Sequence, residues 1–164
     1  MSDTILRLTF FLSILIILIM AEILFPKKKR IHNRKDRWIT NGLITLINTA
    51  SVNIVHIAIP LIAIVAAIDV SNGKMGLFNI INFPIWIEII LTVIILDFII
   101  WGQHLLSHKI PFVWRFHRMH HTDRDLDVTT AVRFHPFEII FSMFIKITSI
   151  YILGASAIAV IIFE

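Results

Sequence analysis

The sequence has 164 residues, 57% of them hydrophobic, and its mean hydropathy of +0.86 exceeds what a soluble domain needs to cover one core. The net charge of +4 comes from basic residues that flank apolar stretches without forming a nucleic-acid-binding module, so the expected partner is the membrane and not nucleic acid. The absence of cysteine excludes disulfides, thiolate metal sites and cysteine-ligated iron–sulfur clusters within the chain.

We therefore predict an all-α, multi-pass integral membrane protein, a bundle of about four hydrophobic helical segments. The first span is expected from Ile5 to Phe25, with Arg7 and Glu22 close enough to its ends to reach the membrane surface. It lacks a basic start and a small-residue cleavage site, so we interpret it as a permanent anchor and not as a signal peptide.

A strongly basic segment, Pro26 to Asn41, follows the first span. The positive-inside rule places this loop on the cytoplasmic side, and a nucleic-acid or localisation patch is the alternative. Its seven basic residues are Lys27, Lys28, Lys29, Arg30, Arg34, Lys35 and Arg37.

The second apolar region, Ile39 to Ile68, is too long for one upright span and carries a polar stripe. We expect this stripe to face other helices, where amides and hydroxyls find partners that lipid cannot supply. The stripe consists of Asn41, Thr45, Asn48, Asn53 and His56. For His56 we expect a structural role, with a haem ligand as the alternative. Residues 69–84 contain turn residues and a single lysine, which suits the outer side.

A third span is predicted from Pro84, and it ends in His104 and His108. If the second region crosses the membrane once, this span returns to the cytoplasmic side. At about 100° per residue, Asp97 shares one arc with both histidines and lies roughly 10 Å deeper than His104. Asp97 is therefore too deep to share a metal with them. We expect it to face the bundle, where it would accept a hydrogen bond from a ligand histidine or pair with another interior donor.

Five histidines gather at the end of this span. His104 and His108 are four residues apart, so their rings can converge on one ion. Pro111 should end the helix, and the segment WRFHRMHH then brings a second convergent face with His117, His120 and His121. Packing does not explain two such faces, because each buried neutral imidazole would need a hydrogen-bond partner. A solvated, salt-bridged cap is expected from the charged residues that follow, namely Asp123, Asp125, Asp127, Arg133 and His135.

Residues 97–138 resemble the core of the fatty acid hydroxylase superfamily, the sterol desaturase family of integral membrane non-haem di-iron oxygenases. The resemblance rests on the HxxxH box at 104–108, the WRFHRxHH box at 114–121, and the turn with Arg133, His135 and Pro136. It implies two iron ions in a cytoplasmic histidine-rich cap. Their implied ligands are His104, His108, His117, His120 and His121. For His135 a ligand, a ligand-supporting residue and a helix-start residue are alternatives, and we expect one of the latter two.

The resemblance divides the chain into an N-terminal transmembrane region (1–96), a histidine-box core (97–138) and an apolar segment (139–164). The family's pattern continues with another histidine and a last HxxHH box, which this sequence lacks. As one span, residues 137–163 would end the chain outside. As a hairpin turning near Gly154, they would leave too few residues to recross a hydrocarbon core of about 30 Å. We expect a truncated form of a longer enzyme, with a natural short, inactive relative as the alternative.

With a complete site, the resemblance implies hydroxylation or desaturation of a lipid of sterol or fatty acyl type, with O2 as co-substrate. The electrons would come from a donor such as cytochrome b5, a ferredoxin or a reductase, because the sequence has no flavin or dinucleotide fingerprint. Two other classes stay open. One is a zinc-dependent membrane hydrolase, although the sequence has no HExxH pair. The other is a catalytically inactive metal-binding membrane protein.

Overall fold

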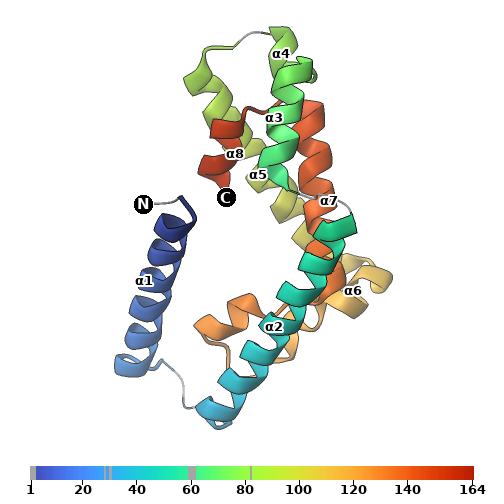
Figure 1. The fold of residues 1–164 in the computed structure, drawn as a ribbon. Helices are drawn as coiled ribbons and strands as arrows, with labels where there is room; N and C mark the ends of the chain where they lie inside the picture. Colours follow the sequence, from blue (N-terminus) through green and yellow to red (C-terminus); the bar gives the residue numbers. More distant parts are fainter. Residues whose placement is uncertain (1–2, 28, 30, 59–61, 82) are drawn as a thin grey trace.

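The computed structural model describes residues 3–27, 29, 31–58, 62–81 and 83–164. These residues form helices and turns without a strand, which confirms the predicted all-α bundle (Figure 1). The α-helices are α1 (Asp3–Leu24), α2 (Arg34–Ala58), α3 (Ala63–Gly73), α4 (Leu77–Ile81), α5 (Ile85–Lys109), α6 (Pro111–His117), α7 (Pro136–Leu153) and α8 (Ala157–Phe163). Two short 3-10 helices, η1 (His120–Thr122) and η2 (Val128–Val132), lie between α6 and α7.

Three stretches are long and apolar enough to cross a membrane, as an integral membrane protein requires. They are Ala63–Ile81, Ile85–Lys109 and Pro136–Leu153, and Thr9–Leu24 in α1 forms a shorter apolar helix. In Figure 1, α1 stands apart from the group formed by α3, α5, α7 and α8. Large apolar side chains of α1, including Phe10, Ile17 and Leu24, are exposed, as expected for a helix that contacts lipid.

The second apolar region is divided between two helices. α2 begins at Arg34, inside the basic segment, because the side chain of Asn33 accepts a hydrogen bond from the N–H of Lys35 at 3.1 Å and so caps the helix. α2 ends at Ala58 and α3 begins at Ala63. The small residues Ala63, Ala66 and Ala67 of α3 are buried. They allow close packing of α3 on its neighbours α7 and α8.

Two tight turns meet at the end of this helical group. Gly76 and Gly154 both have positive φ, 86° and 76°. A Cβ on Gly76 would lie 2.3 Å from the backbone nitrogen of Gly154 and 2.8 Å from the carbonyl oxygen of Tyr151. Both positions therefore require glycine for the backbone conformation and for the close approach of the two turns.

Gly76→Ala is predicted to lower the free energy of unfolding by about 2 kcal/mol or more, because a Cβ adds the cost of a left-handed conformation to a clash with backbone atoms. Thermal unfolding of the purified protein in detergent measures the effect. The control is Gly42→Ala in α2, where a Cβ would meet nothing within 4 Å. Equal melting temperatures for the two variants would contradict this account of the turn.

Candidate metal centre

The chain reverses direction between α5 and α6, and this reversal brings the two histidine pairs together. α5 ends at Lys109, and Ile110 has extended backbone angles (φ −92°, ψ 114°), as the residue before a proline prefers. Pro111 then begins α6, where its missing N–H costs nothing. The prediction that Pro111 ends the third span is confirmed. The reversal of the chain packs α6 against α5.

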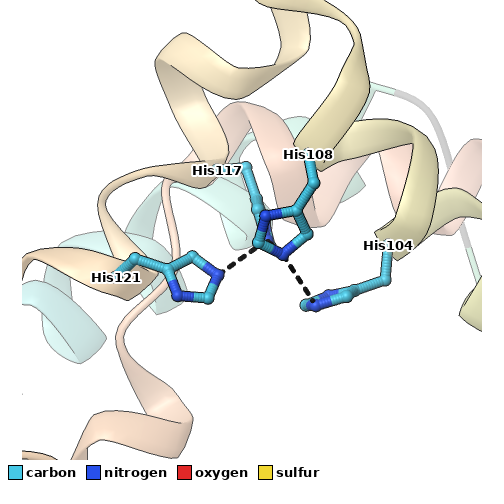
Figure 2. A group of neighbouring side chains, drawn as sticks. All are labelled: His104, His108, His117 and His121. Atoms are coloured by element: carbon cyan, nitrogen blue, oxygen red, sulfur yellow. Dashed lines mark hydrogen bonds between the residues drawn. The ribbon is translucent and has the colours of Figure 1, made fainter.

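Four histidine side chains converge at this reversal. His104 and His108 come from α5, His117 ends α6 and His121 lies in η1 (Figure 2). One nitrogen from each ring lies within 4.8 Å of the corresponding nitrogen of every other ring. The Nε2 of His108 is 3.2 Å from that of His104 and 3.3 Å from that of His117. The Nε2 of His121 is 3.1 Å from that of His117.

These distances suit the donor atoms of one metal ion. An ion with bonds of about 2.0–2.1 Å to imidazole nitrogen holds neighbouring donors roughly 3.0–3.4 Å apart. Hydrogen bonds alone satisfy the group less well, because the Nε2 of His117 has one lone pair but faces both His108 and His121. The donor set therefore fits a metal ion that accepts all four lone pairs.

Glu138 fixes the orientation of the central ring. Its Oε1 lies 2.5 Å from the Nδ1 of His117, and His117 is completely buried while Glu138 is 8% exposed. Because the carboxylate accepts the Nδ1 proton, Nε2 keeps its lone pair and points into the group. Sequence reasoning did not find this role, although Glu138 closes the segment RFHPFE at the start of α7.

The surroundings of His117 and His121, the two members of the group that lie outside α5, favour neutral imidazole rings. Burial, and then the nearby His108 and His120, lower the pKa of His117. Burial and the neighbouring histidines, first among them His117, likewise lower the pKa of His121. A neutral imidazole is the form that binds a metal, so both rings are in their ligand form at neutral pH.

His120 is not part of this group of four. Its ring stacks on Phe134 with centroids 4.8 Å apart and an interplanar angle of 4°, and its centroid lies 5.1 Å from that of His121. The Nδ1 of His120 is buried without a hydrogen-bond partner among the described residues. The role of His120 as a ligand stays a prediction.

The two residues expected to support the ligands lie elsewhere. Asp97 is exposed, so the expectation that it faces the bundle is wrong. It does share the α5 stripe of His104 and His108, but in this structure that stripe faces outward. His135 caps α7: its Nδ1 accepts a hydrogen bond from the N–H of Phe137 at 3.1 Å. This is the helix-start role, one of the two expected for it.

The acidic cap is salt-bridged but not solvated. Arg37 of α2 is 8% exposed and donates two hydrogen bonds to Asp123, of 2.8 and 2.7 Å, and one to Asp127, of 3.0 Å. Both aspartates are themselves buried. Although burial favours the neutral acid, hydrogen bonds from Arg37, Thr130 and Asn41 hold the pKa of Asp123 well below its ordinary value. The prediction of a solvated cap missed Arg37, which lies some 90 residues away in the sequence.

The polar stripe of α2 binds the loop that carries His121. Asn41 donates to Thr129 at 2.8 Å, and Asn48 donates to the carbonyl oxygen of Phe134 at 2.6 Å. Arg133 donates to Asn41, to Met119 and to Thr122, so it connects α2 with both ends of the segment around His120 and His121. The inward orientation predicted for the stripe is confirmed for Asn41 and Asn48.

Two other members of the stripe have different outcomes. Asn53 is exposed, which contradicts the prediction, since about 100° per residue places it roughly 120° around the helix from Asn41. The side chain of His56 lies outside the described part of the chain.

Glu138→Ala is predicted to weaken metal binding about 10-fold to 100-fold, the usual cost of losing the partner that orients a ligand histidine. Glu138→Gln should cost less, because its amide oxygen still accepts the Nδ1 proton of His117. Metal titration of the purified protein gives both affinities. The matched control is Glu164→Gln at the other end of the α7–α8 pair, where Glu164 contacts Lys146. A loss of affinity no larger in Glu138→Ala than in this control would contradict the orienting role.

Comparison with known proteins connects this site to a family. Residues 89–164 match the fatty acid hydroxylase family. The chain is 31% identical over 74 residues to an ornithine lipid hydroxylase of Rhizobium tropici, covering 45% of this chain and 22% of that protein. It is 34% identical over 61 residues to a fatty acid hydroxylase of a Lecanicillium species, covering 36% of this chain and 17% of that protein. No solved structure matches.

The matches extend over about a fifth of the length of each relative. The family match, which runs from residue 89 to residue 164, includes the segment that contains the histidines and α7. The resemblance inferred from the histidine boxes is therefore confirmed at the level of the superfamily.

Proposed function

We propose that this chain, whose residues 89–164 belong to the fatty acid hydroxylase superfamily, provides the metal-binding part of a membrane-bound lipid hydroxylase or desaturase. The observation that carries the proposal is the convergence of His104, His108, His117 and His121 at the end of an apolar helix long enough to cross a membrane. A metal at that position lies at the membrane surface, within reach of a lipid.

The open side of the histidine group supports a lipid substrate. His104, His108 and His121 are exposed, whereas His117 is buried behind them. On α5 the exposed Trp101 lies about one turn deeper than His104 and on nearly the same face. Phe98 stacks on Trp101 with centroids 5.5 Å apart. An acyl chain lying along these two rings would reach the metal directly from the bilayer.

The cytoplasmic side is the one we propose for the histidines. Asp125, four residues after His121, accepts hydrogen bonds from the backbone N–H groups of Ile31 and His32 in the basic segment. Arg37, at the end of that segment, holds Asp123 and Asp127. The histidines and the basic segment therefore lie on one side, and the positive-inside rule assigns that side to the cytoplasm.

Iron is the metal that the proposed chemistry requires. Bound iron would activate O2 for the attack on an unreactive lipid C–H bond, chemistry that amino-acid side chains do not supply. His104, His108, His117 and His121 would hold one ion. His120 is the candidate in this chain for contact with a second, and the remaining ligands of a di-iron site would come from residues beyond this group of five histidines.

The residues of this chain would position the metal. Glu138 keeps the Nδ1 proton of His117 and so presents Nε2 to the metal. Arg133 and Arg37 hold the segment with His120 and His121 against α2. Electrons would arrive from a separate donor such as cytochrome b5, a ferredoxin or a reductase, because the chain has neither a cysteine cluster nor a flavin fingerprint.

Metal analysis combined with turnover tests the proposal. The purified protein is loaded with iron or zinc and mixed with lipid extract and a reductant. O2 consumption is recorded, and products are identified by mass spectrometry. A lipid hydroxylase gives near two irons per functional unit and a product heavier by one oxygen atom, whereas a desaturase gives one lighter by two hydrogens. One zinc with reductant-independent lipid cleavage would favour a hydrolase. Metal binding without O2 consumption would favour an inactive metal-binding protein.

A further inference from the structure

A pocket lies apart from the histidines, where the end of α1 meets the loop after His121. Its volume is about 710 Å³. The end of α1 and the basic segment that directly follows it form one wall, and the loop between η1 and η2, almost 100 residues later, forms the other. The lining residues are Leu18, Ala21, Glu22, Phe25, Pro26, Lys27, Lys29, Ile31, Arg124, Asp125 and Leu126.

The rim of this pocket is cationic. Lys27, Lys29 and Arg124 are exposed, and no carboxylate contacts their side chains among the described residues. Of the two acidic residues that also line the pocket, Asp125 uses its carboxylate oxygens to accept hydrogen bonds from the backbone of Ile31 and His32. This arrangement fixes the loop. Among the described residues, neither Asp125 nor Glu22 forms an ion pair with the three cations, which are available to a negatively charged group.

Large apolar side chains lie among these cations. Phe25 is 78% exposed, Ile31 74% and Leu126 73%. Such exposure of large apolar side chains is costly in water, but it suits the boundary between headgroups and acyl chains. Phe25 directly follows α1, whose own apolar residues are exposed, so the pocket continues the surface that the helix presents to lipid.

We propose that this pocket binds an anionic phospholipid of the membrane, with its phosphate among Lys27, Lys29 and Arg124 and one acyl chain along Phe25 and Leu126. A free inorganic anion would use the cations but not the apolar side chains. An acidic protein would have to bury the exposed apolar side chains against charged residues. An anionic lipid satisfies both parts of the surface at once, and its binding does not depend on the metal centre.

Native mass spectrometry in detergent tests the site, using phosphatidylglycerol and phosphatidylcholine as probes. The wild-type protein should retain phosphatidylglycerol more tightly than phosphatidylcholine. Combining Lys27→Gln, Lys29→Gln and Arg124→Gln should weaken phosphatidylglycerol binding about tenfold or more, since each cation near the surface contributes to the attraction of an anionic lipid. The charge-matched control combines Lys35→Gln, Lys109→Gln and Arg115→Gln, exposed residues that do not line this pocket, and it should bind within about twofold of wild type.

A second variant tests the apolar part without changing the charge. Leu126→Ser should weaken phosphatidylglycerol binding about threefold, because the acyl chain loses an apolar contact. Retention of helicity by circular dichroism shows that each variant is folded. Three results would overturn the proposal: equal retention of the two lipids by wild type, equal losses in the two triple variants, or displacement of phosphatidylglycerol by millimolar inorganic phosphate.

Discussion

Replacing His117 with alanine is expected to weaken metal binding by at least about 100-fold, more than the loss of an orienting partner such as Glu138. His117 is the one buried ring of the four, and its Nε2 lies within 3.3 Å of that of His108 and 3.1 Å of that of His121. Without it, the remaining three nitrogens lose the donor that stands between them. Equilibrium dialysis followed by elemental analysis gives the metal bound per chain.

Two histidines outside the group serve as controls for this prediction. The ring of His32 contacts Asp125 and not a member of the group, so His32→Ala should retain its metal. His56→Ala, in the polar stripe of α2, should also retain it. His121→Ala should resemble His117→Ala, because His121 supplies another of the converging nitrogens. Similar metal losses in all four variants would show that histidines bind metal nonspecifically.

Local sequence rules predicted the parts of the site that lie within one or two helical turns. The spacing of His104 and His108, and the helix end at Pro111, follow from helix geometry and from the missing N–H of proline. Helical spacing could not decide which of His120 and His121 joins the group, since they follow His117 by three and four residues. The 3-10 geometry of η1 decides between them: it turns His121 toward the group and His120 onto Phe134.

The parts that depend on tertiary contacts could not be predicted. Glu138 reaches His117 across 21 residues, and Arg37 reaches Asp123 across 86. No periodic pattern connects residues so far apart, and without the partner the aspartates look like ordinary surface charges. Asp97 fails for the opposite reason. Its helical stripe was correctly placed with the two histidines, but only the packing of α5 decides that this stripe faces outward.

Replacing Arg37 with methionine is expected to lower the free energy of unfolding by about 3–5 kcal/mol, the usual cost of removing one partner from a buried ion pair. The side chain forks onto both oxygens of Asp123 and also reaches Asp127. Without it, Asp123 and Asp127, which follow His121 in the chain, lose the guanidinium that they share. Denaturation of the purified protein in detergent measures the loss, and metal binding should weaken as the loop carrying His121 loosens.

The pH dependence of stability separates this ion pair from general packing. Because the pKa of Asp123 is depressed in the folded protein, its stabilisation is present above the ordinary aspartate pKa of about 3.9 and is lost as the pH falls further. Wild type should therefore lose stability as the pH falls below about 4, whereas Arg37→Met should lose less over the same range. The control is Arg34→Met, three residues earlier in α2, whose guanidinium lies 5.7 Å from the Trp38 ring centroid and should be worth about 1 kcal/mol or less. If Arg37→Met kept the full acid sensitivity of wild type, neighbours other than Arg37 would keep the aspartates ionised. The ion pair would then not be the interaction that holds the loop carrying His121 on α2.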